Sequence, residues 1–314
     1  MIPHKNIIKD LGRIFFWYPL RMIVQAAPLN VAYLIGGLLG GLDYHVSNQK
    51  RVAKMSSNIS LALGVTTREA NRIVQKNLKM HMRNNLEFIK YPKFSKNTVE
   101  ESITFKNIDR LDTALQRGKG VIMLTAHFGA KQLLQIALAL KGYPINQIHY
   151  HMQSGELSFI QKHVAQRHRI KIEAQIPVNF IPANGFLRTG FKCLKDNQVL
   201  IMAGDGIGLK QHMNKSYCPF DIFGKQMLFP IGPAAMTRRT GAVLLPAFVV
   251  RQKMSHHIIF EPPLEVGSKK DQNVTADYVK LLEGHIRQNP WQWEFWEELS
   301  DTLLFRNEKQ FLTN

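Results

Sequence analysis

Cysteine is scarce in this chain of 314 residues, which contains only Cys193 and Cys218. Two cysteines so far apart cannot form a disulfide framework, and neither stands beside histidines at the spacing of a zinc site. The sequence therefore predicts a protein of a reducing compartment, stabilised by a hydrophobic core and built without a metal site.

Acidic residues are also in deficit, with 23 Asp and Glu against 41 Lys and Arg, which gives a net charge of +18. Such an excess attracts anionic partners, which include nucleic acids, acidic membrane surfaces and acidic proteins. No zinc finger, RNP motif or long basic arm accompanies the dispersed basic residues, so nucleic-acid binding would rest on charge alone. A membrane surface accounts for the charge equally well, at about 1 kcal/mol per basic residue near it.

Long hydrophobic runs are missing as well. An aromatic cluster at Ile14–Leu20 follows several basic residues, and a second apolar stretch, Ala26–Leu42, contains Pro28 and four glycines. Neither offers the roughly 20 uninterrupted apolar residues of a membrane-spanning helix, and no signal-peptide cleavage site follows. Trp17 and Tyr18 beside cations are typical of a membrane interface. We expect residues 1–45 to be a membrane-associated helical segment; the alternative is an apolar helix packed on the domain.

Residues 46–314 are expected to form one domain, helical over 46–100 and α/β over 101–314. Thr66 and Glu69 form a capping-box pattern that begins a long amphipathic helix, which Pro92 ends. From residue 103 onward, strand-like and helix-like runs alternate, which indicates a central mixed sheet flanked by helices. The strand-like runs are 120–126, 146–152, 199–204, 242–250 and 257–261.

His127 stands where the apolar run Gly120–Ala126 meets the helix-like run 130–141. A side chain at the carboxyl end of a buried strand faces the crevice in which open α/β sheets bind their ligands. Histidine changes its charge near neutral pH, which suits it to general-base catalysis. The alternative is a structural histidine at a strand end.

The sequence around His127 resembles the His-x4-acid motif of glycerolipid acyltransferases. It is more narrowly similar to the bacterial lipid A late acyltransferases of the lauroyl and myristoyl type. The matching segments run in order from Gly118 to Trp296: His127-Phe128-Gly129, a strand ending in Asp205, a turn at 219–224, a small-residue helix from Gly232, a Pro246-containing strand, Glu261–Leu264 and a tail at 286–293.

This resemblance implies a glycerolipid-acyltransferase-like fold without cofactors, at the cytoplasmic face of the inner membrane. It implies transfer of a fatty acyl chain from acyl carrier protein, or from coenzyme A, to a hydroxyl of an anionic lipid A-type glycolipid. A phospholipid or aminolipid acceptor is the first alternative. In the family the histidine deprotonates the hydroxyl and the motif acid orients the imidazole.

Gln132 stands where the family carries that acid. A glutamine carbonyl can accept the hydrogen bond from Nδ1 but contributes no charge. Three alternatives follow: a slower enzyme, an enzyme whose acid comes from elsewhere, with Asp205 as the best candidate, or a non-catalytic protein that binds lipid or acyl carrier protein.

Four further positions are expected to contact substrate, together with Asp205. The backbone amides of Phe128 and Gly129 precede a helix, where free N–H groups favour an oxyanion. Arg188 and the basic cluster that begins at Arg167 could hold a phosphate or an acid of the carrier protein. Ordinary solvated surface charge is the alternative for both arginines.

Overall fold

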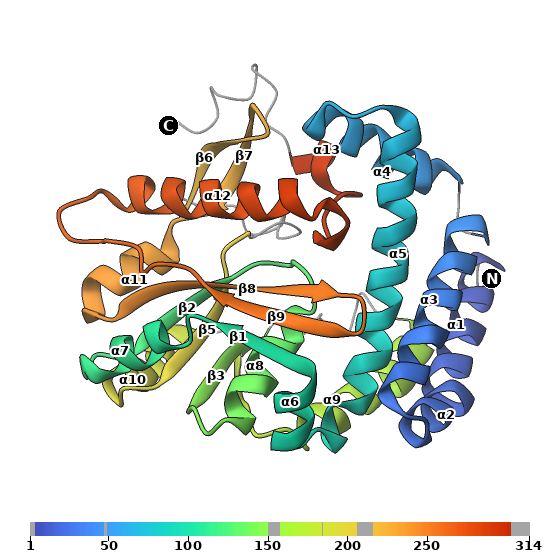
Figure 1. The fold of residues 1–314 in the computed structure, drawn as a ribbon, viewed down its shortest axis with the longest axis horizontal. Coiled ribbons are helices and arrows are strands. Elements are labelled where there is room, and N and C mark those ends of the chain that lie inside the picture. The colour runs from blue at the N-terminus through green and yellow to red at the C-terminus, as the bar shows by residue number, and fades with distance from the viewer. Residues whose placement is uncertain (1–3, 47–48, 150–157, 184, 206–215, 303–314) are drawn as a thin grey trace.

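A seven-stranded sheet forms the centre of the computed structural model, which describes residues 4–46, 49–149, 158–183, 185–205 and 216–302 (Figure 1). Its strand order is β1-β9-β8-β2-β5-β3-β4. All neighbouring strands are parallel except β8 and β9, so the expected mixed sheet is confirmed. The strands are β1 (Ile103–Lys106), β2 (Val121–Thr125), β3 (Ile145–His149), β4 (Asn179–Pro182), β5 (Val199–Ala203), β8 (Val243–Gln252) and β9 (Ser255–Phe260).

Strand β2 lies between β8 and β5 and is buried along its whole length. A strand covered on both faces needs an unbroken apolar sequence, which is what Val121–Thr125 provides. Ile122 and Leu124 belong to the core on one side of the sheet, and Val121 and Met123 to the core on the other. This alternation follows from the two-residue period of a strand, and it leaves the end of β2 fixed from both sides.

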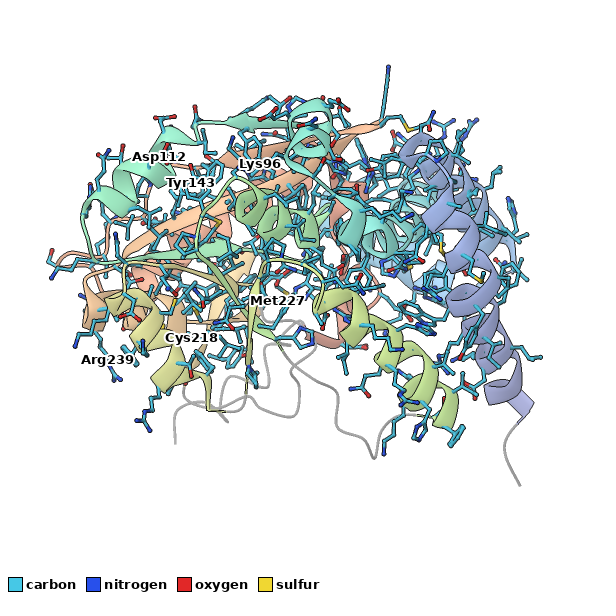
Figure 2. The ribbon with its side chains drawn as sticks, turned by 90° about the horizontal axis from the view of Figure 1, so that it is seen from below. Lys96, Asp112, Tyr143, Cys218, Met227 and Arg239 are labelled. Carbon is cyan, nitrogen blue, oxygen red and sulfur yellow. The ribbon has the colours of Figure 1, made fainter. Side chains whose placement is uncertain are left out.

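Helices cover both faces of the sheet (Figure 1). One core includes α10 (Phe186–Lys195), α11 (Gly232–Thr240) and α12 (Asp271–Gln288). The other includes α6 (Lys96–Ser102), α7 (Asp109–Gln116) and α8 (Lys131–Leu140). On this second side the Tyr143 hydroxyl, beyond α8, donates to Asp112 of α7 at 2.7 Å, and the two residues lie near each other in Figure 2. Further helices and helical turns are α4 (Gln49–Leu63), η2 (Tyr91–Lys93), η4 (Gln161–Gln166), α9 (Arg167–Glu173), η6 (Pro290–Gln292) and α13 (Leu299–Thr302).

A two-stranded hairpin outside the main sheet is formed by β6 (Tyr217–Ile222) and β7 (Lys225–Pro230). Phe223 and Gly224 connect the strands, both with positive φ. Two consecutive positive φ angles are typical of the tightest hairpin turns. The turn expected over 219–224 is therefore the end of a hairpin, and Phe223 stacks on Trp296 of the tail.

The longest helix, α5 (Thr67–Lys90), begins with the capping box that the sequence predicts. The Thr66 hydroxyl accepts from the Glu69 N–H, and the Glu69 carboxylate accepts from the Thr66 N–H. The α-helix ends at Lys90, and the chain continues into the 3-10 turn η2, where Pro92 lacks the backbone N–H that would continue the α-helical hydrogen bonds. Figure 1 shows α5 standing at the edge of the sheet, between the sheet and the N-terminal helices.

The N-terminal segment consists of α1 (His4–Phe15), η1 (Phe16–Leu20), α2 (Arg21–Ala26) and α3 (Leu29–Val46). Helix α3 packs antiparallel on α5, with its glycines in the interface. A Cβ at Gly40 would lie 2.5 Å from the Lys79 Cα, and one at Gly36 would lie 2.9 Å from the Arg83 Cα. The outward face of α3 carries exposed leucines. Over the described residues, no helix combines the length and the apolar character needed to cross a membrane.

A buried polar cluster, which the sequence does not reveal, joins α3, α5 and the sheet. Glu87 is fully buried, accepts from the Tyr33 hydroxyl and pairs with Arg251 at 2.7 Å. His256 lies 3.4 Å from Glu87. The pKa of His256 is lowered to about 4, mainly because its charged form would lose its hydration on burial; the charge of Glu87 opposes this shift, and the cation of Arg251 adds to it. Arg251 also donates to Asn84 at 2.8 Å.

Candidate active site

His127 and Asp205 lie side by side at the carboxyl ends of two neighbouring parallel strands. β2 ends at Thr125 and β5 at Ala203, which are paired in the sheet. The His127 Nδ1 lies 2.8 Å from one Asp205 oxygen, and the His127 backbone N–H donates to the other at 2.6 Å. The Asp205 side chain is fully buried, whereas that of His127 is 29% exposed. With an ionised Asp205, Nδ1 carries the proton, which leaves the lone pair of Nε2 able to accept one.

Gln132 does not occupy the orienting position that the motif spacing predicts. It is the second residue of α8 and half-buried, and the Nδ1 that it would bind is already engaged by Asp205. The acid beside the imidazole comes instead from 78 residues further along the chain. The sequence also predicts a substrate contact for Asp205, whereas in the structure both of its oxygens bind His127 and no part of its side chain is exposed.

The C-terminal tail holds the loop after His127 by main-chain hydrogen bonds. The Gly129 N–H donates to the Gln292 carbonyl at 2.7 Å, and the Glu294 N–H donates to the His127 carbonyl at 2.9 Å. Gly129 has a φ of +60°, and a Cβ there would lie 1.8 Å from the Val249 carbonyl oxygen, so only glycine fits. Asn84 of α5 donates to the Gly129 carbonyl at 2.8 Å.

One of these contacts corrects the expectation for the Gly129 amide. The N–H of Gly129 is not free for an oxyanion, because the Gln292 carbonyl takes it. The Phe128 side chain is buried against Phe248 and His285 and belongs to the core, not to a substrate surface.

A second carboxylate beside His127 comes from Glu294, which accepts from the Lys131 ammonium at 2.7 Å. Burial alone would raise the pKa of Glu294, but the charges of Lys131, His127 and His81 and the hydrogen bond from Lys131 lower it to about 2. The ring of Phe295 lies 4.5 Å from the imidazole. Sequence reasoning missed this pair, and the only hint was a glutamate within an otherwise aromatic stretch, Trp291–Trp296.

The two arginines expected to bind substrate are exposed residues of α9 and α10, and the described contacts join neither Arg167 nor Arg188 to His127 or Asp205. The cluster that begins at Arg167 instead meets the N-terminal aromatic residues. The neighbouring His168 stacks on Trp17, with ring centroids 5.6 Å apart, and meets Tyr18 edge-on. This cluster is therefore part of the surface formed with η1.

Comparisons with known proteins identify the family of this chain. Residues 7–298 match the model of the bacterial lipid A biosynthesis acyltransferase family. The phosphatidylinositol mannoside acyltransferase of Mycolicibacterium smegmatis is 20% identical over 297 residues, covering 93% of this chain and 91% of that protein. The crystal structure of the 1-acyl-sn-glycerophosphate acyltransferase PlsC from Thermotoga maritima aligns with a TM-score of 0.36 at 12% identity, over 81% of this chain and 97% of that one. Because the family model spans nearly the whole sequence, the chain belongs to the bacterial lipid A biosynthesis acyltransferase family and is an acyltransferase of the lipid or glycolipid type.

Proposed function

We propose that this protein transfers a fatty acyl chain from acyl carrier protein to a hydroxyl group of a lipid A-type glycolipid, with His127 as general base and Asp205 as its orienting acid. The observation that carries the proposal is the pair of hydrogen bonds that Asp205 accepts from the ring and the backbone N–H of His127. The alternative of a non-catalytic binding protein rested on Gln132 standing in place of the motif acid. Because Asp205 supplies a carboxylate to the imidazole, this alternative loses its main support.

The chemistry follows from the tautomer that Asp205 enforces. The Nε2 of His127 accepts the proton of the acceptor hydroxyl while the hydroxyl oxygen attacks the thioester carbonyl carbon. The resulting imidazolium is stabilised by the Asp205 carboxylate, which remains ionised throughout. When the C–S bond breaks, the departing thiolate takes the proton back from His127, and the products are an ester and a free thiol.

Support for an acidic carrier protein as donor comes from the exposed side of α5. Arg68, Arg72 and Lys76 recur every four residues and so lie on one face. Lys76 lies 4.8 Å over the ring of Trp291, in the same tail that holds the His127 loop. Similarity to a phosphatidylinositol mannoside acyltransferase favours a second acceptor class, a phosphorylated glycolipid other than lipid A.

The N-terminal helices support association of the protein with an anionic membrane surface, which we propose to be the cytoplasmic face of the inner membrane. Exposed apolar side chains cover their outward side: Leu11, Phe15, Tyr18, Met22, Ile23, Leu34, Leu38 and Leu42. So large an exposed apolar surface is unusual on a soluble monomer and typical of a lipid contact. The basic residues of the chain would add attraction to lipid phosphates.

The proposed function is tested with lauroyl acyl carrier protein carrying a labelled acyl chain and total membrane lipid as acceptor. The native chain is expected to form labelled lipid, and His127→Ala is expected to form none while remaining folded, because the imidazole is not part of the core. His163→Ala, at an exposed histidine outside the site, is the matched control. Near-native turnover by His127→Ala would exclude the site. Binding of lipid or carrier protein without any turnover by the native chain would establish the non-catalytic alternative.

A further inference from the structure

Lys131 and Glu294 form an ion pair, and each of the two residues is also connected to the loop that contains His127. Lys131 is the first residue of α8, four positions after His127. Glu294 donates its backbone N–H to the His127 carbonyl, and the next residue, Phe295, lies against the imidazole. The Lys131 ammonium, 2.7 Å from Glu294, is therefore held in the immediate surroundings of the proposed base.

This pair is less exposed than the other lysine–carboxylate pairs of the described residues. Its side chains are 26% and 18% exposed, against 38% and 42% for Lys54 and Asp301. The remaining pairs, Lys192–Asp196 and Lys269–Asp277, are still more open at the lysine. Charges act more strongly where water is partly excluded. The lowered pKa of Glu294 keeps that carboxylate ionised at every pH at which the enzyme would work.

Acyl transfer needs a donor for the negative charge that develops on the thioester oxygen. The Gly129 amide cannot serve, because its N–H is bound to Gln292. A cation at the start of α8 can donate the hydrogen bond to the oxyanion that the Gly129 amide cannot. Lys131 is such a cation, and Glu294 holds it beside the His127 loop.

We propose that Lys131 is a catalytic residue whose ammonium contacts the thioester carbonyl oxygen, and that Glu294 is a positioning residue that aims it. The inference rests on the proposed acyl transfer. During attack, the hydroxyl proton goes to Nε2 of His127 and the carbonyl electron pair moves onto oxygen beside the Lys131 ammonium, which stays protonated. When the tetrahedral intermediate collapses, that pair re-forms the C=O bond, and the thiolate leaves and takes the proton from His127.

The competing explanation is that the ion pair only fastens the tail to α8. Substituting both residues, Lys131→Glu with Glu294→Lys, separates the two, because it restores an ion pair but moves the positive charge. We expect this double variant to recover the melting temperature without recovering kcat. Lys131→Met is expected to lower kcat about 100-fold, the usual cost of losing one oxyanion donor. Its KM for the donor should change less than about threefold, because the contact forms in the transition state.

Lys131→Arg keeps the charge and should retain most of the turnover even if Lys131→Met folds poorly. Lys54→Met, which removes the Lys54–Asp301 pair, is the matched control and should leave kcat unchanged. The inference is overturned if the double variant regains native kcat, or if folded Lys131→Met keeps it. If the proposed function itself is wrong, the native protein and His127→Ala will be equally inactive in acyl transfer. That outcome would reject the role of Lys131 as well.

Discussion

Asp205 binds His127 twice, at the ring through one carboxylate oxygen and at the backbone through the other. The contact with the ring determines which imidazole nitrogen carries the proton. The contact with the backbone N–H fixes the position of His127 relative to the end of β5. Both constraints come from a side chain that is completely buried, so solvent cannot compete for its oxygens.

Asp205→Asn is expected to abolish most of the activity while leaving the fold intact. An amide at this position can donate to Nδ1 and stabilise the wrong tautomer, a fault that lowers kcat about 10⁴-fold in serine proteases. The measurement is kcat in the acyl-transfer assay, with the melting temperature as the check on folding. Native-like turnover by a folded variant would show that the hydrogen bond has no catalytic part.

Gln132→Glu is expected to change turnover by less than about threefold, because substitutions away from the interacting group have small effects. The Nδ1 that a carboxylate at 132 would bind is already occupied by Asp205. A pH–rate profile compares this variant with Gln132→Ala, and the two should coincide with the native profile. A large gain with glutamate would mean that residue 132 reaches the imidazole after all.

The central strands and the position of His127 could be predicted, because a strand buried on both faces has an unmistakable apolar sequence. The predicted run 199–204 became β5 and 242–250 became β8, each within two residues. The edge strands β1 and β4 were missed, because four residues with mixed burial carry little pattern.

The partners of His127 could not be predicted, because they depend on contacts between distant segments. Motif spacing pointed to Gln132 along a helix, whereas strand pairing brings Asp205 to the ring. Glu294 reaches the loop only because the tail forms main-chain bonds with residues 127–129. The buried pair of Glu87 and Arg251 is likewise invisible in a sequence where each resembles a surface charge.

Stability is expected to fall as the pH drops from about 6.5 to about 4, because of His256. Its folded-state pKa of about 4 lies below the value of an unfolded histidine, so the neutral form favours folding above pH 6.5 and this contribution is lost as the pH falls through 4. The loss should approach about 3 kcal/mol. Urea unfolding of the native chain and of His256→Gln across this range measures it. Equal slopes in both proteins would assign the pH dependence to other groups.

The membrane contact predicts that Leu38→Asp weakens binding to vesicles containing phosphatidylglycerol about tenfold or more, since burying one leucine contributes about 1.5–3 kcal/mol. Leu38 is 76% exposed on α3, so the fold should not suffer. Leu61→Asp, at a 53% exposed leucine of α4, is the control and should bind normally. A point substitution is cleaner than deleting residues 1–42, because Tyr33 satisfies the buried Glu87. Equal binding by both variants would exclude α3 from the contact.

The hydrogen bonds between the His127 loop and residues 292–294 have a consequence for the synthesis of the enzyme. Strands β2 and β5 and both members of the His127–Asp205 pair leave the ribosome long before the tail does. Until Gln292 and Glu294 have emerged, the loop lacks two of its main-chain bonds and Lys131 lacks its carboxylate. A nascent chain can therefore hold the base and its acid without a finished site, and competence to act on lipid arrives only after residues 292–294 have left the ribosome.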